Sequence, residues 1–147
     1  MKYLLLVLLL APLAALHAAD LTLTSPRDFQ VVQRATPTRG MLKIAGQLAE
    51  AVPGDAVLEA RLVGAASDAG WQRLNATFAD RTISGVLDAA AGGWWRLEVR
   101  VSHGGKAVAS GAVEHVGVGE VFVIAGQSNS ANHGQEKQKP QTGRVAT

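Results

Sequence analysis

The residue of this sequence that is best placed to act as a catalytic nucleophile is a serine between two amide side chains. Ser128 follows Gly126 and Gln127 and precedes Asn129, just after an apolar run at 121–125. A serine hydroxyl attacks a carbonyl carbon efficiently only when a base, usually histidine, accepts its proton. The backbone N–H of Ser128 would stabilise the oxyanion that forms, and Gly126 would permit a sharp turn. The same residue types also suit an ordinary polar turn, so both interpretations stand at this point.

The apolar run in front of Ser128 differs from the rest of the chain because it does not alternate with polar residues. Such a run is typical of a strand buried on both faces, as in a parallel sheet covered by helices. Ligands gather at the carboxyl ends of these strands. Position 130 is serine rather than glycine, so the G-x-S-x-G elbow of α/β-hydrolases is absent. The apolar run and the serine that follows it nevertheless predict that an α/β domain, of another kind than the α/β-hydrolases, begins here, over about 118–147.

The residues before this run predict β-structure. In "WRLEVRV" (95–101), apolar and charged residues alternate, which indicates a half-buried antiparallel strand. Four further segments, at 42–48, 56–63, 82–87 and 106–116, are also expected to be strands, and turn residues separate them. We expect an antiparallel, immunoglobulin-like β-sandwich over 20–117.

Three tryptophans lie within the predicted sandwich. Trp71 is expected to begin a strand and fill the core. Trp94 and Trp95 are adjacent, so in a strand they face opposite sides and one of them should be in the core. The other is expected to cover an edge or pack on the neighbouring domain, with stacking on a sugar ring as the alternative.

The stretch "GEVFVIAGQSNS" (119–130) resembles the first conserved block of the sialate O-acetylesterase-like branch of the SGNH (GDSL-like) hydrolases. The residues that match the block are Gly119, Glu120, Val121, Phe122, Gly126, Gln127, Ser128 and Asn129. The resemblance implies that Ser128 is the nucleophile that attacks acetyl esters of carbohydrates, such as sialic acid or xylan. It also implies a β-sandwich in front of an SGNH-type domain, with Gly126, Gln127 and Asn129 lining the site or stabilising its turn. Ser130 departs from the pattern, since many relatives carry Met there.

The family's late Asp-x-x-His motif is absent from the sequence. The histidines are His17, His103, His115 and His133, and none follows an aspartate by three residues. His133 is expected to be an exposed loop residue, His103 a solvated turn residue, and His115 a surface or edge residue of the last strand. We therefore expect the chain to be the N-terminal part of a longer esterase, inactive alone. The alternative is a secreted β-sandwich without enzymatic activity that binds carbohydrate or another partner.

The first nineteen residues predict export. Lys2 precedes the apolar run at 4–16, and small residues follow at 17–19, as in a secretory signal peptide cleaved near Ala18 or Ala19. The protein is then expected in the periplasm or outside the cell, and no longer at a membrane. Loss of Lys2 lowers the net charge of the 147-residue chain from +2 to +1, which does not suggest a nucleic-acid partner. The sequence has no cysteine and no metal-ligand spacing, and a serine mechanism needs no cofactor.

Overall fold

The protein has an all-β fold over the residues that the computed structural model describes, which are 19–64, 67–68, 70–123, 125–126 and 142–143. Within these ranges there is no helix long and apolar enough to cross a membrane. The strands are β1 (Ala19–Ser25), β2 (Gln30–Gln33), β3 (Arg39–Leu48), β4 (Val57–Gly64), β5 (Ser67–Asp68), β6 (Gln72–Arg73), β7 (Ala76–Ala79), β8 (Thr82–Ala90), β9 (Trp94–His103) and β10 (Lys106–Gly119).

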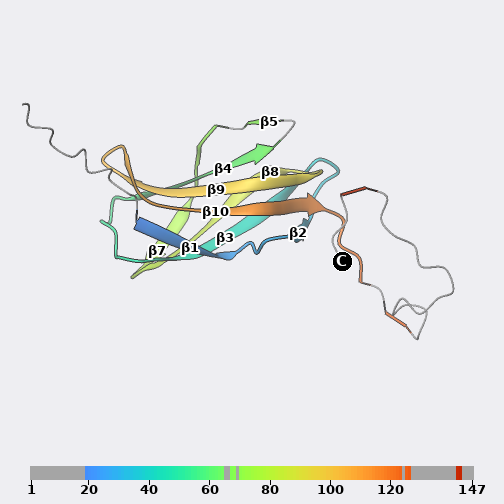
Figure 1. Ribbon diagram of the computed structural model, residues 1–147, viewed down its shortest axis with the longest axis horizontal. Helices are drawn as coiled ribbons and strands as arrows, with labels where there is room; N and C mark the ends of the chain where they lie inside the picture. Colours follow the sequence, from blue (N-terminus) through green and yellow to red (C-terminus); the bar gives the residue numbers. More distant parts are fainter. Residues whose placement is uncertain (1–18, 65–66, 69, 124, 127–141, 144–147) are drawn as a thin grey trace, which may run out of the picture.

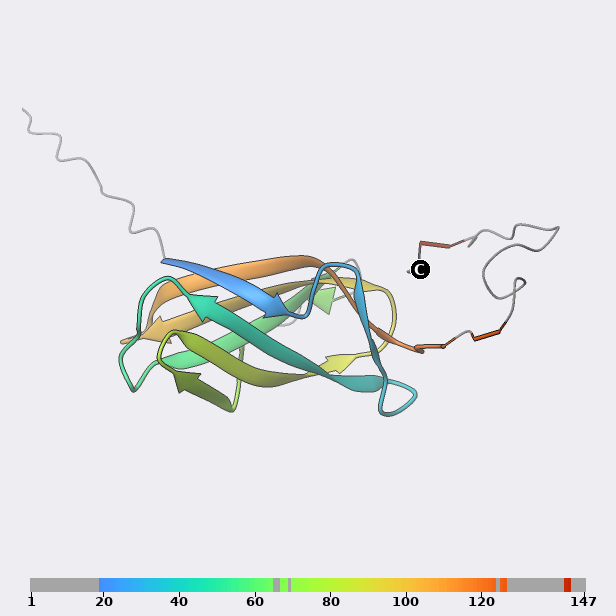
Figure 2. The ribbon, with the colours of Figure 1, turned by 90° about the horizontal axis from the view of Figure 1, so that it is seen from below.

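The strands follow one hydrogen-bonded path that curls back on itself (Figures 1 and 2). The order is β5-β4-β9-β10-β1-β3-β8-β7, with β2 paired to β10 and β6 paired to β4. β1 joins the two halves, because Ala19 and Asp20 pair with β10 whereas Leu21, Thr22, Leu23 and Ser25 pair with β3. The prediction of a purely antiparallel arrangement is wrong at two places: β10 runs parallel to both β1 and β2. The reason is that β1 and β2 approach β10 from across the fold rather than through a hairpin.

The core lies between the two halves of the curled sheet, and the predicted alternation places it correctly. Leu97, Val99 and Val101 of β9 are at most 1% exposed, while the charged residues between them face outward. Apolar residues from the facing strands β3 and β8 complete the same cluster, among them Leu42 and Ile83. The five predicted strand segments are all confirmed, and the last one extends to Gly119.

The apolar run in front of Ser128 does not form the predicted buried strand. β10 ends at Gly119, and Val121, Phe122 and Val123 belong to no strand and are 49%, 79% and 91% exposed. A strand becomes buried on both faces only when neighbouring strands and covering helices flank it. The described part of the chain supplies neither beside these residues. Ile124 lies outside the described residues.

Candidate functional site

The predicted nucleophile lies outside the residues that the structure describes, as do Gln127, Asn129 and His133. Gly126, the first residue of the matched tetrapeptide, is described and lies in an exposed bend. The described residues nearest to Ser128 along the chain are Gly126 before it and Thr142 after it.

The chain that leads toward Ser128 is fixed to the β-fold by a polar clamp made of Gln33, Arg34 and Glu120. Gln33 Nε2 donates to Glu120 Oε2 at 2.7 Å, and Arg34 Nε donates to Glu120 Oε1 at 2.6 Å. Gln33 Oε1 also accepts from the backbone N–H of Val121 at 2.7 Å. The hydrogen bonds from Gln33 and then Arg34 lower the pKa of the Glu120 carboxyl. The clamp sets the direction in which the chain leaves β10.

His115 is paired with a carboxylate rather than lying alone on the surface. Asp28 Oδ1 lies 3.2 Å from His115 Nδ1 and accepts from the His115 backbone N–H at 2.8 Å. The imidazole is stacked on Phe29, with ring centroids 4.2 Å apart and planes inclined by 10°. Its side chain is 43% exposed, which confirms the predicted surface position. A carboxylate that orients a histidine is one element of a serine-hydrolase triad, but no hydroxyl of the described residues is hydrogen-bonded to His115.

The other described histidine is the last residue of β9, directly before the turn at Gly104 and Gly105 rather than within it as predicted. His103 Nε2 is 3.1 Å from Asp55 Oδ1, and the two side chains are 40% and 77% exposed. A polar contact with this exposure is screened by water and contributes little to stability. Nothing in its surroundings indicates a catalytic role.

Trp94 and Trp95 face opposite sides of the sheet, and the prediction that one of them reaches the core is confirmed. Trp95 packs against the core cluster. Trp94 is half-buried on the outer side, next to Phe29 (centroids 5.6 Å apart) and His115 (6.4 Å), both in edge-to-face geometry. Its indole Nε1 donates to the carbonyl oxygen of Gly143 at 2.6 Å. Trp94 therefore joins the β-fold to the chain that comes after the Ser128 segment.

The prediction that Trp71 fills the core is wrong. Its ring is half-buried on the outer face of β4 and β9, with the guanidinium carbons of Arg61 and Arg100 at 4.8 Å and 4.2 Å from the ring centroid. Residue 71 precedes the two-residue edge strand β6, which pairs with the charged outer rim of β4. Cation–π attraction to two arginines explains this position.

The two arginines belong to a charged network across the same face. Arg100 Nε donates to Glu59 Oε2 at 2.8 Å, and Arg61 Nε donates to Glu98 Oε2 at 2.7 Å. The hydrogen bonds from Arg100 and then Ser102 lower the pKa of Glu59, and that from Arg61 does the same for Glu98. Every charge here has an oppositely charged neighbour, so the network stabilises the sheet and offers no uncompensated group for catalysis.

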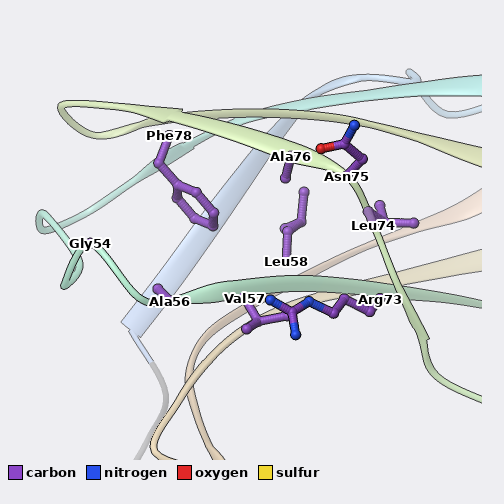
Figure 3. A pocket seen from close by; sticks show the side chains of 9 residues that line it. All are labelled: Gly54, Ala56, Val57, Leu58, Arg73, Leu74, Asn75, Ala76 and Phe78. Carbon is purple, nitrogen blue, oxygen red and sulfur yellow. The ribbon is translucent and has the colours of Figure 1, made fainter.

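A cavity of about 450 Å³ opens between β4 and β7 (Figure 3). Leu58 and Phe78 point into it from opposite sides, and Arg73 and Asn75 are exposed among its lining residues. It lies at the end of the fold where Val57 pairs with Ser102, whereas the end of β10 pairs with Trp94, eight residues or about 26 Å away along β9. The cavity is thus remote from the chain that leads to Ser128. Among the described residues there is also no group of three or more side chains suited to hold a metal ion.

Sequence reasoning missed the polar clamp and the Asp28–His115 pair. The partners in each are separated by 86 to 88 positions, so no local spacing could reveal them. Only the parallel pairing of β2 with β10 brings them together. Comparison of the sequence with known protein families and with curated proteins finds no match.

Proposed function

We propose that this protein is an exported carbohydrate O-acetylesterase with Ser128 as its nucleophile. The observation that carries the proposal is the sequence Gly126, Gln127, Ser128 and Asn129 directly after an apolar run. Ser128 Oγ attacks the acetyl carbonyl as a base takes its proton, and the backbone N–H of Ser128 stabilises the oxyanion. The sugar alcohol leaves with a proton, and water then releases acetate from the serine.

The histidine that this chemistry requires belongs, in this proposal, to a longer form of the protein. The late Asp-x-x-His is missing from the sequence, and Asp28 and His115 serve as a structural pair. The exposed Val121, Phe122 and Val123 fit the same proposal, because they become the first strand of an SGNH-type α/β domain once that domain covers them.

The finer fold belongs to the same proposal. We infer that the β-domain is an immunoglobulin-like sandwich, with β1-β3-β8-β7 as one sheet and β2-β10-β9-β4-β5 as the other. The division of β1 between the two halves and the parallel pairing of β2 with β10 support this assignment. The proposal of export rests on the sequence, in which Lys2, the apolar run at 4–16 and the small residues at 17–19 predict cleavage near Ala18 or Ala19. Sequencing the N-terminus of the exported protein should then find Ala19 or Asp20.

The test of the esterase proposal begins with the intact mass of the protein from its source. A mass far above the 15.3 kDa of this chain is expected. Hydrolysis of an O-acetylated sugar by that protein should then fall by about a thousandfold or more in Ser128→Ala, because loss of one member of a nucleophile–base unit removes most of the catalysis. Ser130→Ala is the matched control and should keep the activity. Full acetylesterase activity in Ser128→Ala would refute the proposal.

The second candidate function is a carbohydrate-binding module. It is favoured by Phe29, whose side chain is 54% exposed beside Trp94, since exposed aromatic rings stack on sugars. Calorimetry against a panel of glycans should then detect binding that Trp94→Ala weakens. Absence of binding to every glycan in the panel would remove this candidate.

A further inference from the structure

Three aromatic rings gather at the end of the fold from which the chain leaves β10. We call Phe29, Trp94 and His115 the aromatic cluster; their centroids lie 4.2 to 6.4 Å apart. Phe29 has a φ of 60°, a conformation that is costly for a bulky side chain, and its N–H donates to the carbonyl of His115 at 2.7 Å. The fold thus holds a ring in a strained backbone conformation and leaves it more than half exposed. Phe29 keeps this exposure with Gly143 in place, so Trp94 is the ring that contacts the later part of the chain.

The chain after β10 touches this end of the fold at two separate points. The first is the polar clamp, in which Gln33 and Arg34 hold Glu120 and the N–H of Val121. The second is Trp94, whose Nε1 donates to the carbonyl of Gly143 at 2.6 Å. Gly119 pairs with Gln33 and Gly117 pairs with Trp94, so the two points are two residues, or about 7 Å, apart along β10. The β-fold therefore contacts the chain at Val121 and again at Gly143, and the two contacts lie close together.

We propose that Trp94 of the aromatic cluster is the docking point for this chain's own Gly143 and acts as its recognition residue. The indole N–H of Trp94 donates to a backbone carbonyl rather than to a side chain, so recognition depends on the backbone position of Gly143 and not on its residue type. The chain between Val121 and Thr142, which carries Ser128, is tied to the β-fold at both ends. This proposal goes beyond the esterase function and holds whether or not Ser128 is a nucleophile.

The chain's own segment is the occupant that the observations favour. A carbonyl of this chain already accepts the Trp94 hydrogen bond, at a short distance for N–H···O. The space around the Cα of Gly143 is open, because a Cβ built there meets nothing within 4 Å. A side chain or probe can therefore be attached at this position without a clash.

The test uses a nitroxide probe at position 143 and the indole N–H signals of the full chain. The sequence has no cysteine, so Gly143→Cys provides a unique labelling site. We expect the probe to broaden the Trp94 indole signal strongly and the Trp71 signal little, relative to the reduced probe. Trp71 is the internal control, since it lies beside Arg100, six residues or about 20 Å from Trp94 along β9. Equal broadening of both signals, or of neither, would overturn the proposal.

Two further measurements separate the other occupants from the chain's own segment. In the first measurement, nitroxide-carrying protein without ¹⁵N is mixed with ¹⁵N-protein that carries no nitroxide. The Trp94 signal of the ¹⁵N-protein should stay sharp in this mixture. Broadening in this mixture would mean that a second copy occupies the aromatic cluster, and the proposal would fail. A stop after Pro140 should shift the Trp94 signal and leave those of Trp71 and Trp95 in place, with unchanged β-sheet circular dichroism. An unshifted Trp94 signal in this folded variant would refute the docking.

Discussion

Gly111 lies where β1 crosses from one half of the fold to the other, and it should tolerate no side chain. A Cβ at position 111 would stand 2.2 Å from the carbonyl oxygen of Leu21, whereas ordinary contact begins at 3.4 Å. The obstacle is backbone, so β1 or β10 would have to move by about 1.2 Å, the difference between these distances. The affected stretch of β1 holds the pairings of Ala19 and Asp20 with β10 and the start of the ladder with β3.

We expect Gly111→Ala to lower the free energy of unfolding by about 3 kcal/mol, the upper end of the usual cost of overpacking. The expected fall in melting temperature is roughly 10–20 °C for a domain of this size. Gly54→Ala is the matched control, because a Cβ at Gly54 meets nothing within 4 Å and its φ is not in the left-handed region. That control should lie within about 1 kcal/mol of the parent, on either side.

Urea denaturation followed by tryptophan fluorescence measures both variants against the parent. The midpoint of Gly111→Ala should fall well below that of Gly54→Ala, with the same dependence on urea concentration. If the two alanine variants differ by less than about 0.5 kcal/mol, β1 does not cross at Gly111 as described, and the account of how the two halves are joined is wrong.

Two other predictions concern the core and the charged face. Leu97 is fully buried on β9, so Leu97→Ala should cost about 3 kcal/mol, whereas Val86→Ala, at a 42% exposed side chain of β8, should cost less than about 0.5 kcal/mol in the same denaturation assay. The pKa values of Glu59 and Glu98 are lowered below their ordinary 4.5, so their stabilisation is complete above that pH and is lost as the pH falls through their folded-state values. The free energy of unfolding of the double variant Glu59→Gln, Glu98→Gln should therefore fall less between about pH 5 and pH 3 than that of the parent, by about 1 kcal/mol. An equal fall in both proteins would show that neither carboxylate is held by its arginine.

The sequence predicted the strands because the information is local. In β9 the buried residues alternate with polar ones, most of them charged, and this period of two residues fixes both the strand and its core face. Partner choice is not local. β1 and β2 run parallel to β10 across some 85 to 90 positions, and no alternation within either segment indicates that pairing. Trp71 was misplaced for the same reason, because Arg61 and Arg100, which attract its ring, reach it from two other strands.

The candidate site illustrates how a residue pattern depends on its surroundings. The run at 121–125 has the composition of a buried strand, yet Val123 is 91% exposed. Burial of apolar side chains is favourable only when other surfaces cover them, and a strand cannot supply both of its own faces. Gln33 and Arg34, which hold Glu120, both belong to the β-fold, so the orientation of the exit from β10 is built into that fold. The fold therefore holds the chain as far as Val121, while the apolar side chains of Val121, Phe122 and Val123 face solvent.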